Sequence, residues 1–190
     1  YMKIFITRHG QTEWNAIGKL QGRQDIKLNE VGKEQALTTG EKIKNEKIDI
    51  IITSPLKRAR ETAEIINKQF NVEIVEDDRL MERCYGDFEG ITKVELKEKK
   101  IQYPEIDDAC NYLKNVDIFN METMQDLCAR IYEFLDEITT KYKEENVLIV
   151  THGSSSIPIK CYFMKYPLET LVDREKIKGL ENCEVVEFEI

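Results

Sequence analysis

The chain contains only two histidines, and each stands immediately before a glycine at the end of an apolar run. His9 closes the run 3–8 and His152 closes the run 147–151, and both runs are typical of buried strands. Histidine is the side chain best suited to nucleophilic or acid–base chemistry near neutral pH. Residues just beyond the carboxyl ends of strands line the ligand crevice of an open α/β sheet. Either histidine alone fits an ordinary strand-end residue better, so the surrounding residues must decide whether the two meet in a site.

Two arginines accompany these strand ends and suggest an anion as the ligand. Arg8 directly precedes His9, and small and polar residues follow as far as Asn15. A guanidinium group offers a planar fork of donors to phosphate oxygens, and amides at helix starts add more. Arg58 is expected in the first turn of a helix, where the helix dipole disfavours a cation, so an anion beside it would explain its position. Thr12 is as well explained by capping a short helix.

Strand and helix signals alternate along the chain, which predicts how these residues are positioned. Such alternation predicts a layered α/β/α sandwich with a mainly parallel central sheet. A length of 190 residues suits one domain with a substantial core better than two. Strands are expected at 2–7, 48–53, 72–75, 147–150 and 183–188, and helices at 30–45, 54–70, 93–103, 124–142 and after residue 153.

Capping residues mark the starts of several predicted helices. Asn29 is expected to cap the first long helix. Ser54 is expected to cap the next, with Pro55 in its first turn, where the missing N–H costs nothing. Thr92 and Glu95 have the spacing of a capping box.

Composition limits the classes of protein to which the chain can belong. Its net charge of −8 argues against general nucleic-acid binding, although local arginines can still form a positive pocket for a small anion. The five cysteines are scattered without a C-x-x-C pair, which is typical of reduced thiols in a cytoplasmic protein rather than of disulfides or a zinc site. No secretory signal and no apolar run of ~20 residues is visible, so no membrane partner is expected.

Several motifs occur in a fixed order between residue 3 and about residue 153. They include Arg8-His9-Gly10, Gln21-Gly22, the segment 54–63, the loop 80–90 that carries Glu82, and Thr151-His152-Gly153. Together they resemble the histidine phosphatase superfamily, in its phosphoglycerate-mutase-like branch. One R-H-G tripeptide would be a weak signal, whereas an ordered set that spans most of the chain is a specific one.

The resemblance implies a role for each matching residue. His9 would be the nucleophile that becomes a phosphohistidine, and Glu82 would be the proton donor and acceptor. Phosphoryl transfer depends mainly on positioning and charge stabilisation, which a cluster of fixed donors supplies. No cofactor and no metal are implied, and a two-histidine metal site is disfavoured by the adjacent cation of Arg8. Arg8, Arg58 and His152 would surround the phosphate, and Asn15, Gln21, Gly22 and Gly153 would add contacts to it.

The expected activity is metal-independent hydrolysis of small-molecule phosphomonoesters, with residues 91–121 as a lid or insertion over the active site. The main alternative is a phosphoglycerate mutase. Mutases that resemble this chain carry a longer insertion with paired arginines, whereas no arginine occurs here between Arg83 and Arg130. A second alternative is a non-catalytic binder of phosphorylated ligands, against which the complete catalytic set argues. The natural substrate and the oligomeric state are left open by the sequence.

Overall fold

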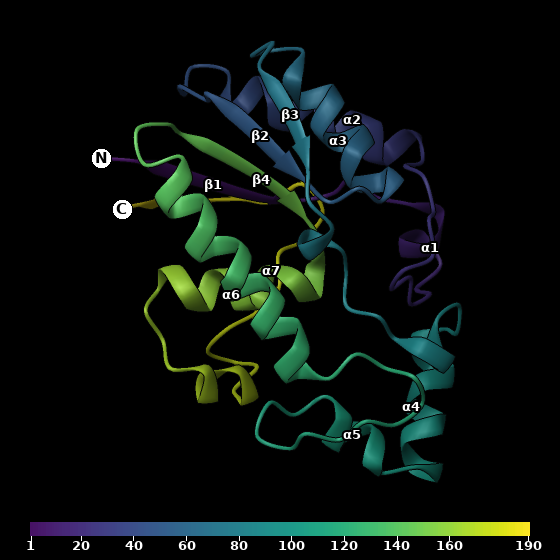
Figure 1. Cartoon of the computed structure of the whole chain (residues 1–190). Coiled ribbons are helices and arrows are strands. Elements are labelled where there is room, and N and C mark those ends of the chain that lie inside the picture. Colours follow the sequence, from purple (N-terminus) through teal and green to yellow (C-terminus); the bar gives the residue numbers. More distant parts are fainter.

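Five strands form one mixed sheet in the order β3-β2-β4-β1-β5, in a computed structural model that describes residues 1–190 (Figure 1). The strands β3 (Glu73–Glu76), β2 (Ile50–Thr53), β4 (Val147–Thr151) and β1 (Lys3–Arg8) are parallel, and β5 (Val185–Glu189) runs antiparallel beside β1. The register pairs Arg8 with Thr151. Because β1 and β4 end opposite each other, the next residue of each, His9 and His152, emerges at the same edge of the sheet.

Helices cover both faces of the sheet, as the alternating sequence pattern predicts. The helices α6 (Met124–Lys141) and α7 (Gly153–Phe163) pack on one face, and α2 (Glu30–Ile43) and α3 (Lys57–Asn67) pack on the other. Ile4 and Ile6 contribute to the first layer and Phe5 to the second, because successive side chains of a strand point to opposite faces. A sheet buried on both faces explains why its central strands are continuous apolar runs. The predicted α/β/α sandwich is therefore confirmed.

The predicted caps of two helices are confirmed. The side chain of Asn29 accepts a hydrogen bond of 2.8 Å from the amide of Gly32 and thereby caps α2. Thr92 and Glu95 form the reciprocal capping box of α4 (Lys93–Gln102). In both cases a local side chain satisfies amides that the first helical turn leaves without partners. The short helix α1 (Glu13–Ala16) is likewise capped by Thr12.

The prediction that Ser54 caps α3 is wrong. That helix begins at Lys57, and the extended residue Leu56 occupies its N-cap without a side-chain bond. Ser54 lies at the carboxyl end of β2, where its hydroxyl contacts the Nε2 atom of His152 at 2.7 Å. A partner 98 residues away in the sequence therefore outweighs the local capping preference.

The segment between β3 and α6 forms a small cluster of its own beyond the carboxyl edge of the sheet. It contains the 3₁₀ turns Asp78–Leu80 and Gly86–Phe88, then α4 and α5 (Glu105–Ala109). Phe88, Ile106 and Met121 are buried together in this cluster. Figure 1 shows α4 and α5 set apart from the two main helical layers. After α7 a further 3₁₀ turn, Leu168–Val172, precedes β5, and none of the helices combines the length and apolar composition needed to cross a bilayer.

The turn that follows His9 is held against α2 by a close backbone approach. A Cβ atom added to Gly32 would lie 2.1 Å from the carbonyl oxygen of Gln11, and one added to Gly10 would lie 2.4 Å from that of Gly32. The amide of Gln11 also donates to the side chain of Gln35 at 2.8 Å. Only glycine at these two positions allows α2 to fix the turn so closely.

Replacing Gly32 by alanine is therefore expected to lower the free energy of unfolding by about 1–3 kcal/mol, because the new methyl group meets rigid backbone. Gly40 provides a matched control in the same helix, since its added Cβ would first meet the flexible side chain of Gln69 at 3.3 Å. Gly40→Ala should be neutral or stabilise by about 0.5–1 kcal/mol, as expected for a glycine inside a helix. Urea unfolding measures both variants, and equal losses of stability would contradict the close-approach argument.

Candidate active site

The two histidines meet at the carboxyl edge of the sheet, as predicted. Their ring centroids are 5.2 Å apart, and both side chains are buried. The main-chain amide of His9 donates to the carbonyl oxygen of Thr151 at 3.0 Å, which continues the β1–β4 ladder past the end of the strands. The amide of Gly10 donates to the hydroxyl of Thr62 on α3 at 3.0 Å. The backbone around His9 is thus fixed from two sides.

The imidazole of His9 is oriented so that one ring nitrogen is available for chemistry. Its Nδ1 atom lies 2.6 Å from the carbonyl oxygen of Gly10. A carbonyl can only accept, so Nδ1 carries the proton and Nε2 carries the lone pair. Burial lowers the pKa of His9 well below the ordinary value, and the charges of Arg58 and Arg8 lower it further. The neutral ring with a free Nε2 atom is therefore the form present near neutral pH.

Two arginines, the fully buried Arg58 and the half-buried Arg8, each have a buried Nε donor without a protein partner. The Nη atoms of Arg58 donate to the carbonyl oxygens of Gln24 and Gly22, each at 2.7 Å, while its Nε atom has no partner. Arg8 likewise donates through Nη1 to the carbonyl of Leu180 at 3.1 Å and keeps a buried, unpartnered Nε atom. Buried donors without partners are costly and rare in proteins. An anion that accepts from both would satisfy them.

His152 adds a third unpartnered donor beside His9. Ser54 Oγ accepts from the amide of Leu56 at 3.3 Å, so its own proton can be given to His152 Nε2. The single proton of the neutral ring then lies on Nδ1, which is buried and has no partner. Burial lowers the pKa of His152 well below the ordinary value, and the charges of Arg58 and Arg8 lower it further.

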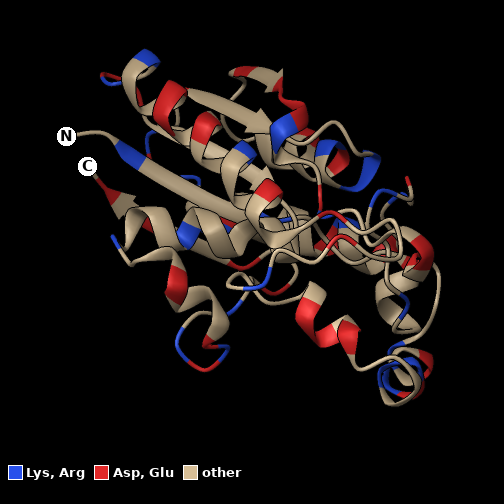
Figure 2. Cartoon of the chain, turned by 60° about the horizontal axis from the view of Figure 1, so that its bottom comes forward, with Lys and Arg blue, Asp and Glu red and all other residues tan.

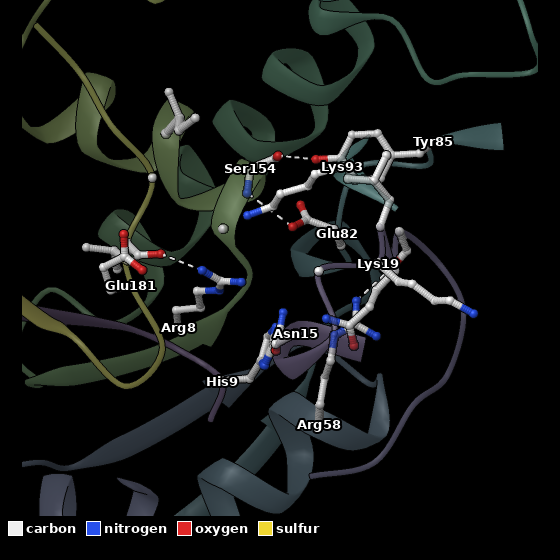
Figure 3. A pocket seen from close by; sticks show the side chains of 18 residues that line it. Arg8, His9, Asn15, Lys19, Arg58, Glu82, Tyr85, Lys93, Ser154 and Glu181 are labelled. Carbon is white, nitrogen blue, oxygen red and sulfur yellow. Dashed lines mark hydrogen bonds between the residues drawn. The ribbon is translucent and has the colours of Figure 1, made fainter. Parts of the chain in front are cut away.

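Glu82 lies at the amino end of α7, on the other side of the same space. Its carboxyl oxygens accept from the amides of Ser154 and Ser155, each at 3.1 Å, and from the amide of Arg83 at 2.8 Å. The amides of the first helical turn have no partners within the helix, and the oxygens of Glu82 satisfy two of them. Figure 3 shows Glu82 facing the space above Arg8 and His9.

A cavity of about 290 Å³ joins these groups. His152, whose ring lies beside that of His9, is not part of the lining of this cavity. Charges of both signs are interspersed along the helices of the whole chain (Figure 2), so the concentration of cations at this cavity is a local feature. Of the residues predicted to form the site, those that line the cavity are Arg8, His9, Asn15, Gln21, Gly22, Arg58, Glu82 and Gly153.

Comparison with known proteins identifies the family. The sequence model of the histidine phosphatase superfamily (branch 1) matches residues 4–190. The chain belongs to this superfamily. "Uncharacterized phosphatase PhoE" from Bacillus subtilis is 43% identical over 153 residues, which cover 80% of this chain and 72% of that protein. "Phosphoglycerate mutase" from Schizosaccharomyces pombe is 32% identical over 165 residues, covering 80% and 74%.

A solved structure agrees with the fold over its whole length. Bacillus stearothermophilus YhfR superimposes with a TM-score of 0.86 at 30% sequence identity, covering 100% of this chain and 92% of that one. The resemblance to the superfamily stated from the sequence motifs is therefore confirmed, as is the fold class. The motifs at residues 8–10 and 151–153 lie at the carboxyl ends of β1 and β4, and the motif at residues 54–63 runs from the end of β2 into the first turns of α3.

Two residues at the cavity of this superfamily member were not predicted from the sequence to belong to the site. Lys93 and Tyr85 line it next to Ser154, and Figure 3 shows the ammonium group of Lys93 directed toward Glu82 and Ser154. Lys93 is the first residue of α4, a position where the helix dipole disfavours a cation. Lys93 could therefore have been predicted as a site residue from the sequence, on the same grounds as Arg58. Nothing in the local sequence signals the contact between the hydroxyl groups of Tyr85 and Ser154.

The loop that carries Glu82 is anchored by an ion pair behind the site. Arg130 Nε and Glu122 Oε1 are 2.6 Å apart, and Arg130 also donates to the carbonyl oxygens of Arg79 at 2.5 Å and of Glu82 at 3.3 Å. Arg23 donates to the same Glu82 carbonyl at 2.7 Å. Burial alone would raise the pKa of Glu122, but the hydrogen bond and charge of Arg130 outweigh it and lower that pKa.

Glu122→Gln is expected to lower the free energy of unfolding by about 3 kcal/mol, because it leaves a largely buried guanidinium without its counter-charge. Since the folded-state pKa is lowered, this stabilisation is present above the usual glutamate pKa and is lost as the pH falls below it. Glu133→Gln is the control, because Glu133 faces Arg79 from an exposed position and should contribute less than about 0.5 kcal/mol. Urea unfolding at several pH values measures both variants. Equal free energies of unfolding for Glu122→Gln and Glu133→Gln would contradict the anchoring role of Glu122.

The lowered pKa values of the two histidines can be tested directly by NMR, because the chain gives only two histidine ring signals. Burial and neighbouring cations disfavour the charged ring, so both signals should keep their neutral-form shifts as the pH falls through about 6.5, where an ordinary histidine titrates. His9→Asn assigns the two signals, and the urea-unfolded chain should titrate normally. A folded-state titration near pH 6.5 for either ring would contradict the structure.

Proposed function

We propose that this protein is a phosphatase that hydrolyses small-molecule phosphomonoesters through a phosphohistidine on His9. The observation that carries the proposal is the set of unpartnered buried donors on Arg8, Arg58 and His152 around a neutral histidine with a free Nε2 atom. A tetrahedral phosphoryl group presents several oxygens to such donors at once. The roles assigned to these residues by the family resemblance are thus supported by an independent physical argument.

In the first step, the lone pair of His9 Nε2 attacks phosphorus as the ester P–O bond breaks. Glu82, entering as the acid, gives its proton to the departing alkoxide oxygen, so the alcohol leaves neutral. Arg8, Arg58 and His152 stabilise charge on the phosphoryl oxygens during transfer. Asn15, Gln21, Gly22 and Gly153 also line the cavity, and in this proposal they add hydrogen bonds to the bound phosphate.

In the second step, a water molecule attacks phosphorus and the P–N bond breaks. The Glu82 carboxylate takes a proton from this water, which returns Glu82 to the acid form and His9 to the neutral form. Inorganic phosphate is then released. One carboxyl serves both half-reactions because the leaving oxygen and the attacking water occupy the same side of phosphorus in turn.

Hydrolysis is favoured over phosphoglycerate mutase activity by the charges near the cavity. A mutase must hold a bisphosphate, and the segment 84–129 contributes no arginine for this purpose. Away from His9, the cations that line the cavity are Lys93 and Lys19, and the charge of Glu181 opposes them. Few cations are therefore left to bind a second phosphate group. As part of the proposal, residues 91–121 with α4 and α5 cover this side of the active site.

Mixing the protein with a phosphomonoester in the presence of a chelator, and quenching it with base, should trap acid-labile phosphate on His9. His9→Ala should show neither the intermediate nor turnover. Arg58→Ala should lower kcat/KM by about 10²–10³, the usual effect of removing one charge-stabilising donor. Arg60→Ala is the matched control on the same helix, because Arg60 is exposed and pairs with Glu64. Activity that survives His9→Ala, or faster interconversion of phosphoglycerates than hydrolysis, would refute the proposal.

A further inference from the structure

A second cavity of about 190 Å³ adjoins the first beneath α4 and α5. The two cavities share Leu20, Tyr85, Ser154 and Ile157 in their linings. The contact between the hydroxyl groups of Tyr85 and Ser154 forms part of the wall between them (Figure 3).

The second cavity differs from the first in its chemistry. Its lining is mainly apolar and includes Phe88, Leu96, Ile106, Met121 and Met124. A volume of about 190 Å³ is sufficient for one aromatic ring, since an engineered apolar cavity of about 150 Å³ binds benzene.

The cations at the edge of this second cavity already have partners. Arg83 donates to the carbonyl oxygens of Ala109 and Glu122 at 2.7 and 2.9 Å, and its guanidinium lies over the ring of Tyr85. Lys100 pairs with Asp107 at 2.6 Å. Arg174 also lines this cavity, from an exposed position, and donates to the carbonyl oxygen of Cys110 at 3.5 Å. The second cavity therefore offers mainly apolar contact area with its cations at the edge, whereas the first offers buried, unpartnered donors.

We infer that the second cavity receives an uncharged, apolar part of the substrate alcohol, such as an aryl or short alkyl group, while the phosphate lies at His9. This inference rests on the proposed phosphatase function. Glu82 lies next to the wall that separates the two cavities. Ser154 donates its main-chain amide to Glu82, and its hydroxyl group forms part of that wall. Rotation of the small Ser154 side chain separates it from Tyr85 and opens the passage. The ester oxygen then lies beside the carboxyl that protonates it.

The competing placement leaves the alcohol in the polar mouth of the first cavity, between Lys93 and Glu181. That placement would favour charged or hydroxylated alcohols, because such groups pair with exposed ions without losing contact with water. The two placements predict opposite responses when the second cavity is filled.

Leu96→Trp fills the second cavity from α4, and Val94→Trp is the matched control because Val94 is exposed on the same helix. Filling should raise KM for phenyl phosphate and lower its kcat/KM by about tenfold or more, while glycerol 3-phosphate changes by less than about twofold. Val94→Trp should leave both substrates unchanged. Comparing each variant with the wild type for one substrate at a time removes the intrinsic difference between the two leaving groups.

Calorimetric binding of phenylphosphonate and methylphosphonate gives a readout that needs no turnover. The wild type should prefer the phenyl compound by about tenfold or more, with a more negative heat-capacity change, and Leu96→Trp should lose this preference. Met121→Phe replaces Leu96→Trp if the latter fails to fold. Equal effects on both ligands, or no effect, would overturn the assignment of the cavity. The phosphatase proposal is tested separately by turnover. If it is wrong, the wild type does not hydrolyse phosphomonoesters, whether or not it prefers phenylphosphonate in the binding experiment.

Discussion

Arg58 has no exposed surface, yet no carboxylate lies within ion-pair distance of its guanidinium group. Its charge is instead met by two main-chain carbonyls from the loop 22–24. Carbonyl dipoles offset only part of the cost of burying a cation, and burial accordingly lowers the pKa of Arg58 to about 10. The burial of His9 and His152 lowers their pKa values, and the positive potential of Arg58 lowers them further, so both rings are neutral. A dianionic phosphoryl group would neutralise this uncompensated charge. The buried charge of Arg58 therefore contributes both to the neutral state of the nucleophile His9 and to the preference of the site for phosphate.

The position of the acid depends on a separate set of contacts. Glu82 accepts amides from the start of α7, while its own carbonyl is held by Arg23 and Arg130. The carboxyl is thus held through both its side chain and its backbone. Because it belongs to neither sheet nor long helix, such contacts replace the rigidity that the strand ends give to the histidines.

The features of the fold and the site that depend on local sequence pattern could be predicted from the sequence. The continuous apolar strands gave the layered fold, and matching strand ends brought His9 and His152 together. The misplaced cap at Ser54 shows the limit, because its role is set by a histidine on another strand. Residues 103–121 showed no period because α5 is only five residues long and the chain then reverses through Phe119 and Asn120, both with positive φ. The anchoring of Glu82 also could not be predicted, since Glu122 and Arg130 are distant in sequence and carry no motif.

The strand order has a consequence for how the site arises during synthesis. β1 lies between β4 and β5 in the sheet. The segment that leads into β5 also contacts the site: Asn182 Nδ2 donates to the carbonyl oxygen of His9 at 2.9 Å, and the amide of Cys183 donates to the carbonyl oxygen of Arg8 at 3.0 Å. β1 is therefore synthesised before both of the strands that pair with it, and its pairing must wait for them. Pairings between the two ends of a chain are slow to form because a long loop must close first. A nascent chain consequently carries the nucleophile long before it has a catalytic pocket.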